Sequence, residues 1–438
     1  MTKVPRAAFL RTTWELSTLV ALGDFGLDMR QFERDNQGKA SNDDMANQHE
    51  DVQSFISRRL HSLLFLEEFV FSRNEFSPPS GSELELADAV VMLGNVLLIY
   101  QIKERSADEV GDENAERRWF HSKVLGKATK QVRDTLRYLQ MYDEICVPNE
   151  RGRIFNLAAR QFTDVIRVVV HMPSRILPED CRSIRHYTSK SAGLIHIVEA
   201  QDYLEISRTL RVPQEVVRYF KYREMVLTRF STACGALPEP AIAGHFIGGD
   251  FDVPPSLESA SHLFRLVQDD DEWDLTPLMR GLHNHLPVPG MGDDYYDILI
   301  EFAKLPRSMW RKIKERIRFC VQAVQKGEFD RPYRVTDPST DCGFVFVAVD
   351  PETSARPDWP EIRLQGLQNF AMAHKYDQRL SKCVGFMIAK DGEHFDILWC
   401  LVSHPWVEDP EMQERLDRSF PFRPVRRSVE HSYRFVDG

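Results

Sequence analysis

The sequence predicts an α/β protein in which a mixed central sheet flanked by helices is followed by a C-terminal α+β domain. Apolar runs of strand length alternate with amphipathic segments of helical period. The 438 residues are 42% hydrophobic, which is enough for two or three domains with cores of their own. Residues 235–256 are rich in Gly and Pro, so we expect a linker there.

The first domain is expected over 50–234, after an N-terminal segment, 1–49, that contains a polar excursion. Its hydrophobic periodicity predicts, in order, a helix over 50–66, a strand over 69–71, a hairpin within 85–103, a helix over 119–143, strands over 166–172 and 194–199, and a helix over 213–227. Pro213 suits the first position of that last helix.

The C-terminal domain is expected over 257–438, with a role in recognition, regulation or assembly. The same periodicities predict helices over 294–305, 308–326 and 360–379, and strands over 343–349, 383–389 and 395–402.

Composition restricts the classes of function and the compartment. A net charge of −10 disfavours a protein that coats nucleic acid, but it allows an enzyme with a local basic surface. The seven cysteines are scattered without a Cys-x-x-Cys, which favours reduced thiols over a zinc ribbon or disulfides. The chain lacks a signal-peptide core and an apolar run of about 18 residues. We therefore expect a cytoplasmic protein that does not enter the membrane. We also expect a homo-oligomer.

Three polar side chains interrupt the expected hairpin: Asp88, Gln101 and Lys103. Two apolar runs flank Gly94-Asn95, and a Gly-first pair suits a two-residue type II′ turn. Such a turn places Asp88 directly opposite Gln101, with Lys103 on the same sheet face. Burying an acid, an amide and an ammonium costs several kcal/mol unless they are paired or bind a metal.

These residues resemble a known family. Glu85-Leu-x-Asp88 followed by Gln101-Ile-Lys103 is similar to the PD-(D/E)xK nuclease superfamily, in the variant of Mrr-like restriction nucleases where Gln replaces the second acid. The resemblance covers about 50–230 and implies a restriction-endonuclease-like fold. It further implies Mg²⁺-dependent (or Mn²⁺-dependent) endonuclease activity, with DNA as the expected substrate and restriction or antiviral defence as the setting.

The resemblance assigns roles to four residues. Asp88 would be the main metal ligand, and the side-chain oxygen of Gln101 and the backbone carbonyl of Ile102 would complete the protein's share. Lys103 would orient or deprotonate the attacking water, or neutralise developing charge.

A helix carboxylate often joins such a site, and Glu68 is the candidate, with Glu67 as the second choice and Glu85 as a further one. The neutral Gln101 leaves the site with one negative charge fewer. The alternative is therefore a catalytically inactive nuclease-like protein, held by a buried Asp88–Lys103 ion pair, that acts as a nucleic-acid-binding or protein-interaction module.

A basic stripe follows the hairpin. Lys123, Lys127, Lys130 and Arg137 fall near one face of the predicted helix, and Gln131 lies one turn beyond Lys127. This stripe would track a phosphate backbone, and the alternative is a solvated helix face. A second basic stretch, 304–318, would bind nucleic acid or an acidic partner, or be an exposed helix. The acidic run 269–272 is expected to be a solvated loop, and the alternative is an oligomer contact to a basic patch.

Overall fold

The computed structural model describes residues 8–15, 52–78, 81–106, 109–157, 162–284, 294–392, 394–424 and 428–436. The chain forms two compact units. The six-stranded unit comprises Met45–Val267 and Tyr433–Gly438, and the five-stranded unit comprises Met1–Asp44 and Gln268–Ser432. The six-stranded unit is thus an insertion in the sequence of the other. The predicted excursion at 28–52 lies almost entirely outside the described residues.

The six-stranded unit is built on a mixed sheet, as predicted. Its strand order is β10 (His186–Ser189), β11 (Gly193–Glu199), β9 (Asp164–Met172), β6 (Val96–Glu104), β5 (Ala89–Leu93), β2 (Val70–Phe71). β6, β9 and β11 are parallel, and the outer strands are antiparallel to their neighbours.

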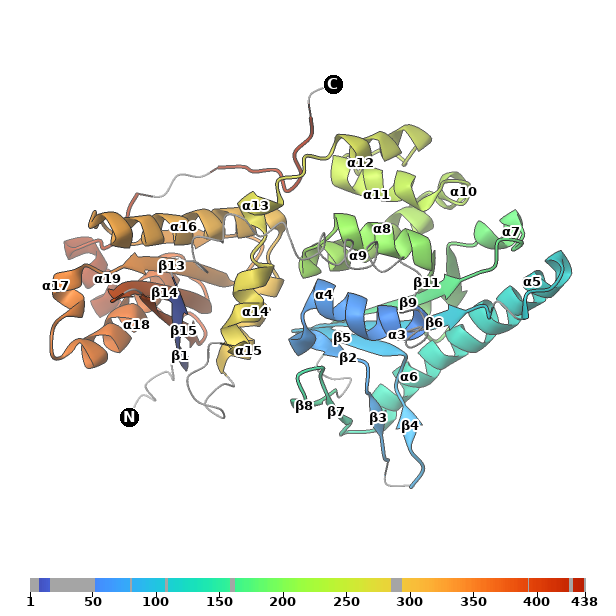
Figure 1. The fold of residues 1–438 in the computed structure, drawn as a ribbon, viewed down its shortest axis with the longest axis horizontal. Helices are drawn as coiled ribbons and strands as arrows, with labels where there is room; N and C mark the ends of the chain where they lie inside the picture. The colour runs from blue at the N-terminus through green and yellow to red at the C-terminus, as the bar shows by residue number, and fades with distance from the viewer. Residues whose placement is uncertain are drawn as a thin grey trace, which may run out of the picture. The chain divides into compact units, whose positions relative to one another are not determined.

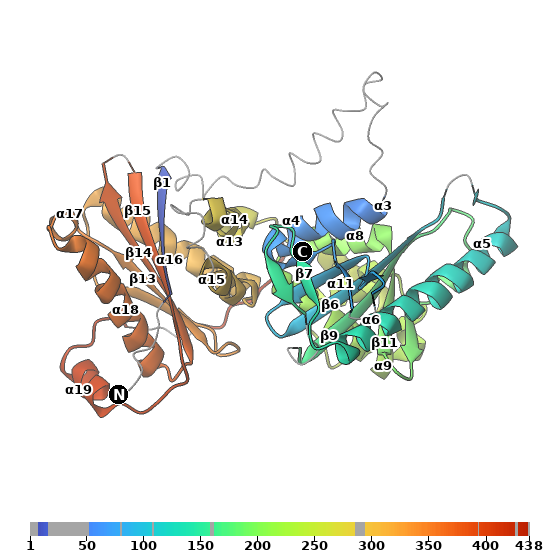
Figure 2. The ribbon, with the colours of Figure 1, turned by 90° about the horizontal axis from the view of Figure 1, so that it is seen from below.

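Helical segments cover both faces of this sheet (Figures 1 and 2). One segment contains α3 (Val52–Ser54), the π-helical η2 (Phe55–Leu60) and α4 (His61–Phe65), and α8 (Ala200–Thr209) and α9 (Pro213–Arg229) share its side. The other contains α5 (Glu113–Trp119), the π-helical η5 (Phe120–Ala128) and α6 (Thr129–Met141). Tyr100 of β6 contacts His61 and Tyr203 on the first side. Val169, the neighbour of Gln101 across β6 and β9, packs with Phe120 on the second side.

The predicted linker at 235–256 is instead part of the six-stranded unit, and the division falls after Val267. Residues Glu239–Gly248 form α11, which is buried along most of its length. Pro240 stands in the first turn of this helix, and Gly249 ends it in the left-handed conformation at φ +79°. Pro and Gly are favoured at these helix boundaries, so the residues that suggested a linker delimit a helix.

The five-stranded unit contains a second mixed sheet with helices, in agreement with the α+β prediction. Its strand order is β1 (Ala8–Glu15), β15 (His394–Ser403), β14 (Lys382–Asp391), β13 (Cys342–Ala348), β12 (Tyr333–Thr336). β1 pairs antiparallel with β15, so part of the expected N-terminal segment is an edge strand of this sheet.

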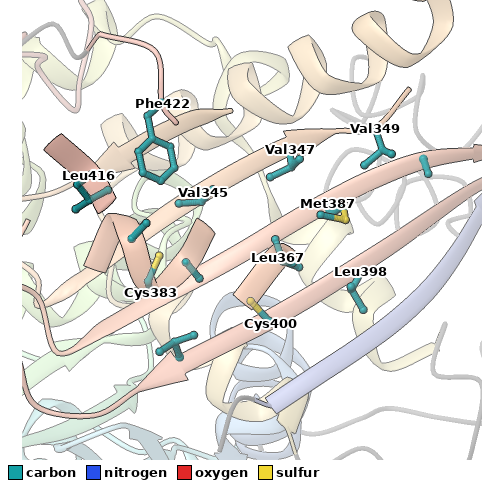
Figure 3. Packing of buried hydrophobic residues seen from close by; sticks show 14 residues of the cluster. Val345, Val347, Val349, Leu367, Cys383, Met387, Leu398, Cys400, Leu416 and Phe422 are labelled. Carbon is teal, nitrogen blue, oxygen red and sulfur yellow. The ribbon is translucent and has the colours of Figure 1, made fainter. Parts of the chain in front are cut away.

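Helix α18 (Trp359–Asp377) covers one face of this second sheet (Figure 3). Leu367 of α18 is fully buried among Val345, Met387 and Cys400 from three neighbouring strands. This apolar contact gives the five-stranded unit a hydrophobic core of its own. The unit also contains α13 (Asp270–Trp273), α14 (Thr276–Asn284), α15 (Asp294–Ala303), α16 (Arg307–Lys326), α17 (Pro351–Ser354) and α19 (Pro410–Arg418).

The two charged runs of this unit bind each other. Arg311 of α16 lies 2.8 Å from Asp269, and Lys314 donates a 2.9 Å hydrogen bond to the backbone carbonyl of Asp274. Arg307 stacks its guanidinium 4.1 Å from the ring centre of Trp273. All three cations are buried, so the expectation of an exposed basic helix is wrong for them. The acidic run lies largely in the helix α13 rather than in a loop, and its residues Asp271 and Glu272 are exposed.

Smaller elements complete the described chain: η3 (Glu67–Phe69), β3 (Glu75–Phe76), β4 (Leu84–Glu85), β7 (Cys146–Pro148), β8 (Ile154–Asn156), α7 (Glu179–Arg182), α10 (Ser231–Cys234), η7 (Leu257–Ala260) and α12 (Ser261–Arg265). None of the helices in the described ranges is long and apolar enough to cross a bilayer.

Candidate active site

The central hairpin has the predicted register. Leu93 pairs with Val96 and Ala89 pairs with Tyr100, so the loop is the two residues Gly94-Asn95. Gly94 has φ +63°, the sign that a type II′ turn requires at its first central position. The paired strand begins at Ala89, and Asp88 lies in a bend one residue before it.

The three predicted polar residues come together around one ammonium group. Lys103 Nζ lies 3.0 Å from Asp88 Oδ2, 2.9 Å from the backbone oxygen of Ile102 and 3.5 Å from Gln101 Oε1. Asp88 is 8% exposed and Gln101 is 1% exposed, while the Lys103 side chain is 14% exposed. The oxygens proposed as metal ligands therefore converge on a single point, which the ammonium occupies.

Asp88 has two further hydrogen-bond donors. The backbone N–H of Ile102 donates to Oδ2 at 2.5 Å. The carboxylate therefore accepts a hydrogen bond that a backbone carbonyl of a neighbouring strand would otherwise accept. Gln53 Nε2 in α3 donates to Oδ1 at 3.1 Å. We did not predict Gln53, because a lone amide in the first turn of a helix has no sequence feature that marks it as functional.

Two side chains hold the backbone that leads into Asp88. Asn74, which is fully buried, accepts from the N–H groups of Leu86 and Ala87 at 3.0 and 3.1 Å, and it donates to Ala87 O and Phe71 O at 2.8 and 2.9 Å. Thr135 of α6 donates to the backbone oxygen of Leu86. The carboxylate is thus positioned by side chains from a loop and from α6, and the sequence pattern indicated neither contact.

The helix over the site begins earlier than predicted. Asp112 accepts from the Ala115 N–H and caps α5, which starts at Glu113 rather than near residue 119. Arg105, two residues beyond Lys103, donates to the fully buried Glu116 of α5 at 3.1 Å. This pair fastens the helix to the end of β6, on the side of the sheet where Gln101 lies.

The predicted basic stripe divides into two pairs. Lys130 and Arg137 each form an ion pair with Asp134, at 2.6 and 3.1 Å. Lys123 and Lys127 are exposed, and neither ammonium group makes a hydrogen bond or ion pair with another described residue. Lys123 and Lys127 are therefore the members of the stripe most available to a phosphate.

Gln131 has a buried Oε1 with no hydrogen-bond partner among the described residues. It lies one helical turn before Thr135, which contacts the loop that leads to Asp88. A buried amide oxygen without a partner costs about 1–3 kcal/mol, so Gln131 is a candidate for binding a ligand or a water near the site.

Glu85 lies close to the site and carries an altered acidity. Partial burial and the negative charges of Asp88 and Glu75 raise the pKa of Glu85 above its usual range, and the charges of Lys103 and Lys127 oppose this. Glu75 stands directly opposite Glu85 in the β3–β4 pair, an arrangement of like charges that costs stability. Glu85 is thus a second carboxylate near Asp88, and a nearby cation stabilises its charged form.

Glu68 does not join the cluster, and neither does Glu67. β2 pairs antiparallel with β5, Val70 opposite Val91, which puts Glu68 near the Leu93 end of the hairpin, about 15 Å along the strand from Asp88. There both glutamates form ion pairs with Arg151, at 3.0 and 3.1 Å. Its position before β2 in the chain suggested Glu68. Because β2 is antiparallel to β5, however, the C-terminal end of β2 lies near Asp88, and the N-terminal end, next to Glu68, lies away from it.

His171 is a polar neighbour that sequence reasoning missed. In the parallel register of β6 and β9 it pairs with Lys103, so both lie on the same sheet face. Burial, together with the charges of Arg182 and Arg185, lowers the pKa of His171 to about 3. The imidazole is therefore neutral and does not add a positive charge beside Lys103.

The available oxygen ligands include few carboxylates, but they are of the kinds that a hard divalent cation binds. No cluster of three His, Cys, Asp or Glu side chains that would hold a metal occurs in the described ranges. The available ligands are instead one carboxylate, one amide oxygen and one backbone carbonyl. Mg²⁺ takes oxygen ligands of these types, and it commonly keeps several waters and binds substrate phosphate as well. The three oxygens already surround one cation, the ammonium of Lys103.

Comparison with known proteins identifies no relative: no protein-family model, no curated protein and no solved structure matches the chain.

Proposed function

We propose that this protein is a metal-dependent nuclease that hydrolyses phosphodiester bonds, with DNA as its substrate and the six-stranded unit as a restriction-endonuclease-like catalytic domain. The observation that carries the proposal is the convergence of Asp88, Gln101 and the Ile102 carbonyl on Lys103 Nζ. Two exposed lysines of the covering helix, Lys123 and Lys127, add positive charge for a phosphate backbone.

Each residue has a separate task in this proposal. Asp88 Oδ2, Gln101 Oε1 and Ile102 O would hold Mg²⁺ or Mn²⁺. A bound ion of this kind lowers the pKa of a water and stabilises negative charge on the phosphate. Lys103 then donates hydrogen bonds to the attacking water or to a phosphate oxygen. Gln53 and the Ile102 N–H keep Asp88 oriented through the contacts described above.

The test is a cleavage assay with single-stranded and double-stranded DNA, and with RNA, in the presence of Mg²⁺ or Mn²⁺. We expect cleavage by the wild type and a loss of at least about a hundredfold in Lys103→Ala, since one positioned catalytic group typically contributes that much or more. Lys326→Ala, which removes an exposed lysine at the end of α16, is the control and should retain full activity.

A second candidate, a nuclease-like protein without catalysis, is favoured by the closed Asp88–Lys103 ion pair. The 3.0 Å pair satisfies both charges without any metal. If the wild type and Lys103→Ala are equally inert on every substrate but bind nucleic acid, this candidate replaces the nuclease. If they neither cleave nor bind, a nucleic-acid function at this site is excluded.

A further inference from the structure

The ammonium group of Lys103 occupies the place that a metal ion would need. Three oxygens surround Nζ, at 3.0 Å for Asp88, 2.9 Å for Ile102 and 3.5 Å for Gln101. All three belong to residues that are at least nine-tenths buried, so they have little water available as an alternative partner. The ammonium thus satisfies the same oxygens that a divalent cation would take as ligands.

Two cations cannot share this position. Positive charges only a few Å apart, away from bulk water, repel strongly, and the three oxygens supply a single negative charge, that of Asp88. The neighbouring side chain on β9 is the neutral His171, so Lys103 contributes the positive charge on this side. Among the described contacts, the negative charge of Asp88 is therefore paired directly with the ammonium of Lys103.

Lys103 has a route out of this position. Its side chain is 14% exposed, whereas the Asp88 side chain is 5% exposed. The charge of Lys103 acts on Glu85, whose carboxylate makes no hydrogen bond or ion pair with any other described residue. The ammonium can therefore turn toward water and Glu85 without disturbing the packing of the sheet.

We propose that Lys103 and a divalent cation compete for the oxygens of Asp88, Gln101 and Ile102, so that Lys103 keeps the site closed until a metal displaces its ammonium. The inference rests on the proposed function for the identity of the metal ligands. Its consequence is that the lysine needed for cleavage also weakens metal binding.

Binding of Mn²⁺ alone, without nucleic acid, tests the competition. Titration calorimetry or the electron paramagnetic resonance signal of free Mn²⁺ gives the dissociation constant for the full chain. We expect Lys103→Met and Lys103→Gln to bind Mn²⁺ about tenfold or more tightly than the wild type, since a charge-assisted hydrogen-bonded competitor is removed. Asp88→Asn should abolish this binding.

Lys127→Met is the matched control. It removes a lysine charge that also acts on Glu85 but makes no contact with the three oxygens. We expect a change of no more than about twofold, because an exposed charge is screened. An equal gain in Lys127→Met and Lys103→Met would overturn the proposal in favour of general electrostatics, and so would an unchanged affinity in both Lys103 variants.

Amine labelling of the wild-type protein provides a readout that does not depend on a variant. Saturating Mn²⁺ should increase the labelling of Lys103 by an amine-reactive reagent, measured by mass spectrometry, and leave that of Lys127 unchanged. Unchanged or decreased labelling of Lys103 would contradict the displacement. Because neither experiment uses cleavage, the competition can be confirmed when no nuclease activity is found, and it can fail when activity is present.

Discussion

At the scale of single residues, Asn74 shows how the candidate site depends on a side chain outside it. Its amide makes four hydrogen bonds, three of them to the two residues that lead into Asp88. Sequence patterns assign Asn to turns without distinguishing a buried anchor from an exposed one. The role of Asn74 is therefore visible only in the folded chain.

We predict that Asn74→Ala lowers the free energy of unfolding by about 2–4 kcal/mol, because buried backbone groups of Leu86 and Ala87 lose their partners. Chemical denaturation measures this loss. Mn²⁺ binding should weaken as well, since the backbone before Asp88 is released. Asn369→Ala, at an exposed position of α18, is the control and should change stability by less than about 0.5 kcal/mol. An Asn74 variant as stable as this control would contradict the clamp.

Some residues of the site could be predicted from the sequence, and others could not. Asp88, Gln101 and Lys103 were predictable because a two-residue turn determines which residues of a hairpin oppose each other. Gln53 and His171 were not, because they reach the cluster from other elements. Glu68 was assigned to the site from chain order, and the direction of β2 excluded it.

At the scale of elements, α13 and α16 pack through charged side chains rather than through apolar ones alone. Arg311 pairs with Asp269, and Lys314 is 1% exposed and donates to a backbone carbonyl. Burial lowers the pKa of Lys314 to about 8, and the nearby aspartates oppose this only in part. Charge patterns in the sequence indicated two separate exposed surfaces because neither pattern reveals its partner.

The lowered pKa of Lys314 predicts a pH-dependent effect on stability. Below pH 8 the lysine is charged in both states, and its burial costs free energy. As pH rises from about 8 to 10.5, the unfolded chain binds more protons than the folded one, so this cost disappears. Lys314→Met should therefore raise the free energy of unfolding by about 1–2 kcal/mol at pH 7, after the lost hydrogen bond is subtracted.

Denaturation at pH 7 and near pH 10 checks this prediction. The advantage of Lys314→Met over the wild type should shrink at the higher pH. Lys326→Met, which removes an exposed lysine from the same helix, should show no such trend. An advantage that grows with pH would show that Lys314 is not held at a lowered pKa.

At the scale of the whole molecule, the order of the units in the chain differs from a simple two-domain sequence. The six-stranded unit is inserted after β1 of the five-stranded unit, and residues near the C-terminus return to it. There Val436 N–H donates to Arg265 O at 2.8 Å. The chain therefore passes between the two units three times.

This organisation predicts which fragments fold. Arg223 of α9 is fully buried and pairs with Glu239 of α11 at 2.6 Å. A fragment ending at residue 234, the boundary expected from the sequence, would leave this guanidinium buried without its partner, at a cost of about 3–5 kcal/mol. We expect the fragment 45–267 to unfold cooperatively on heating, followed by circular dichroism, and the fragment 45–234 to be unfolded or aggregated. Equal melting temperatures for the two fragments would show that α11 is not required.

The sequence by itself determined the elements and the local pairing. Periodicity predicted most helices and strands within a few residues, and the Gly94-Asn95 turn set the hairpin register, with Ala89 opposite Tyr100 and Asp88 one residue before the paired strand. These features depend on interactions between residues close in the chain, which a sequence pattern records directly.

Only the tertiary structure decided what depends on contacts between distant segments. It showed that β1 completes the C-terminal sheet, that two charged runs bind each other, and that α11 belongs to the six-stranded unit. It also placed the Lys103 ammonium among the three candidate ligand oxygens. Burial and charge pairing between distant residues set these outcomes, because each group takes the partner that the fold brings within hydrogen-bond distance.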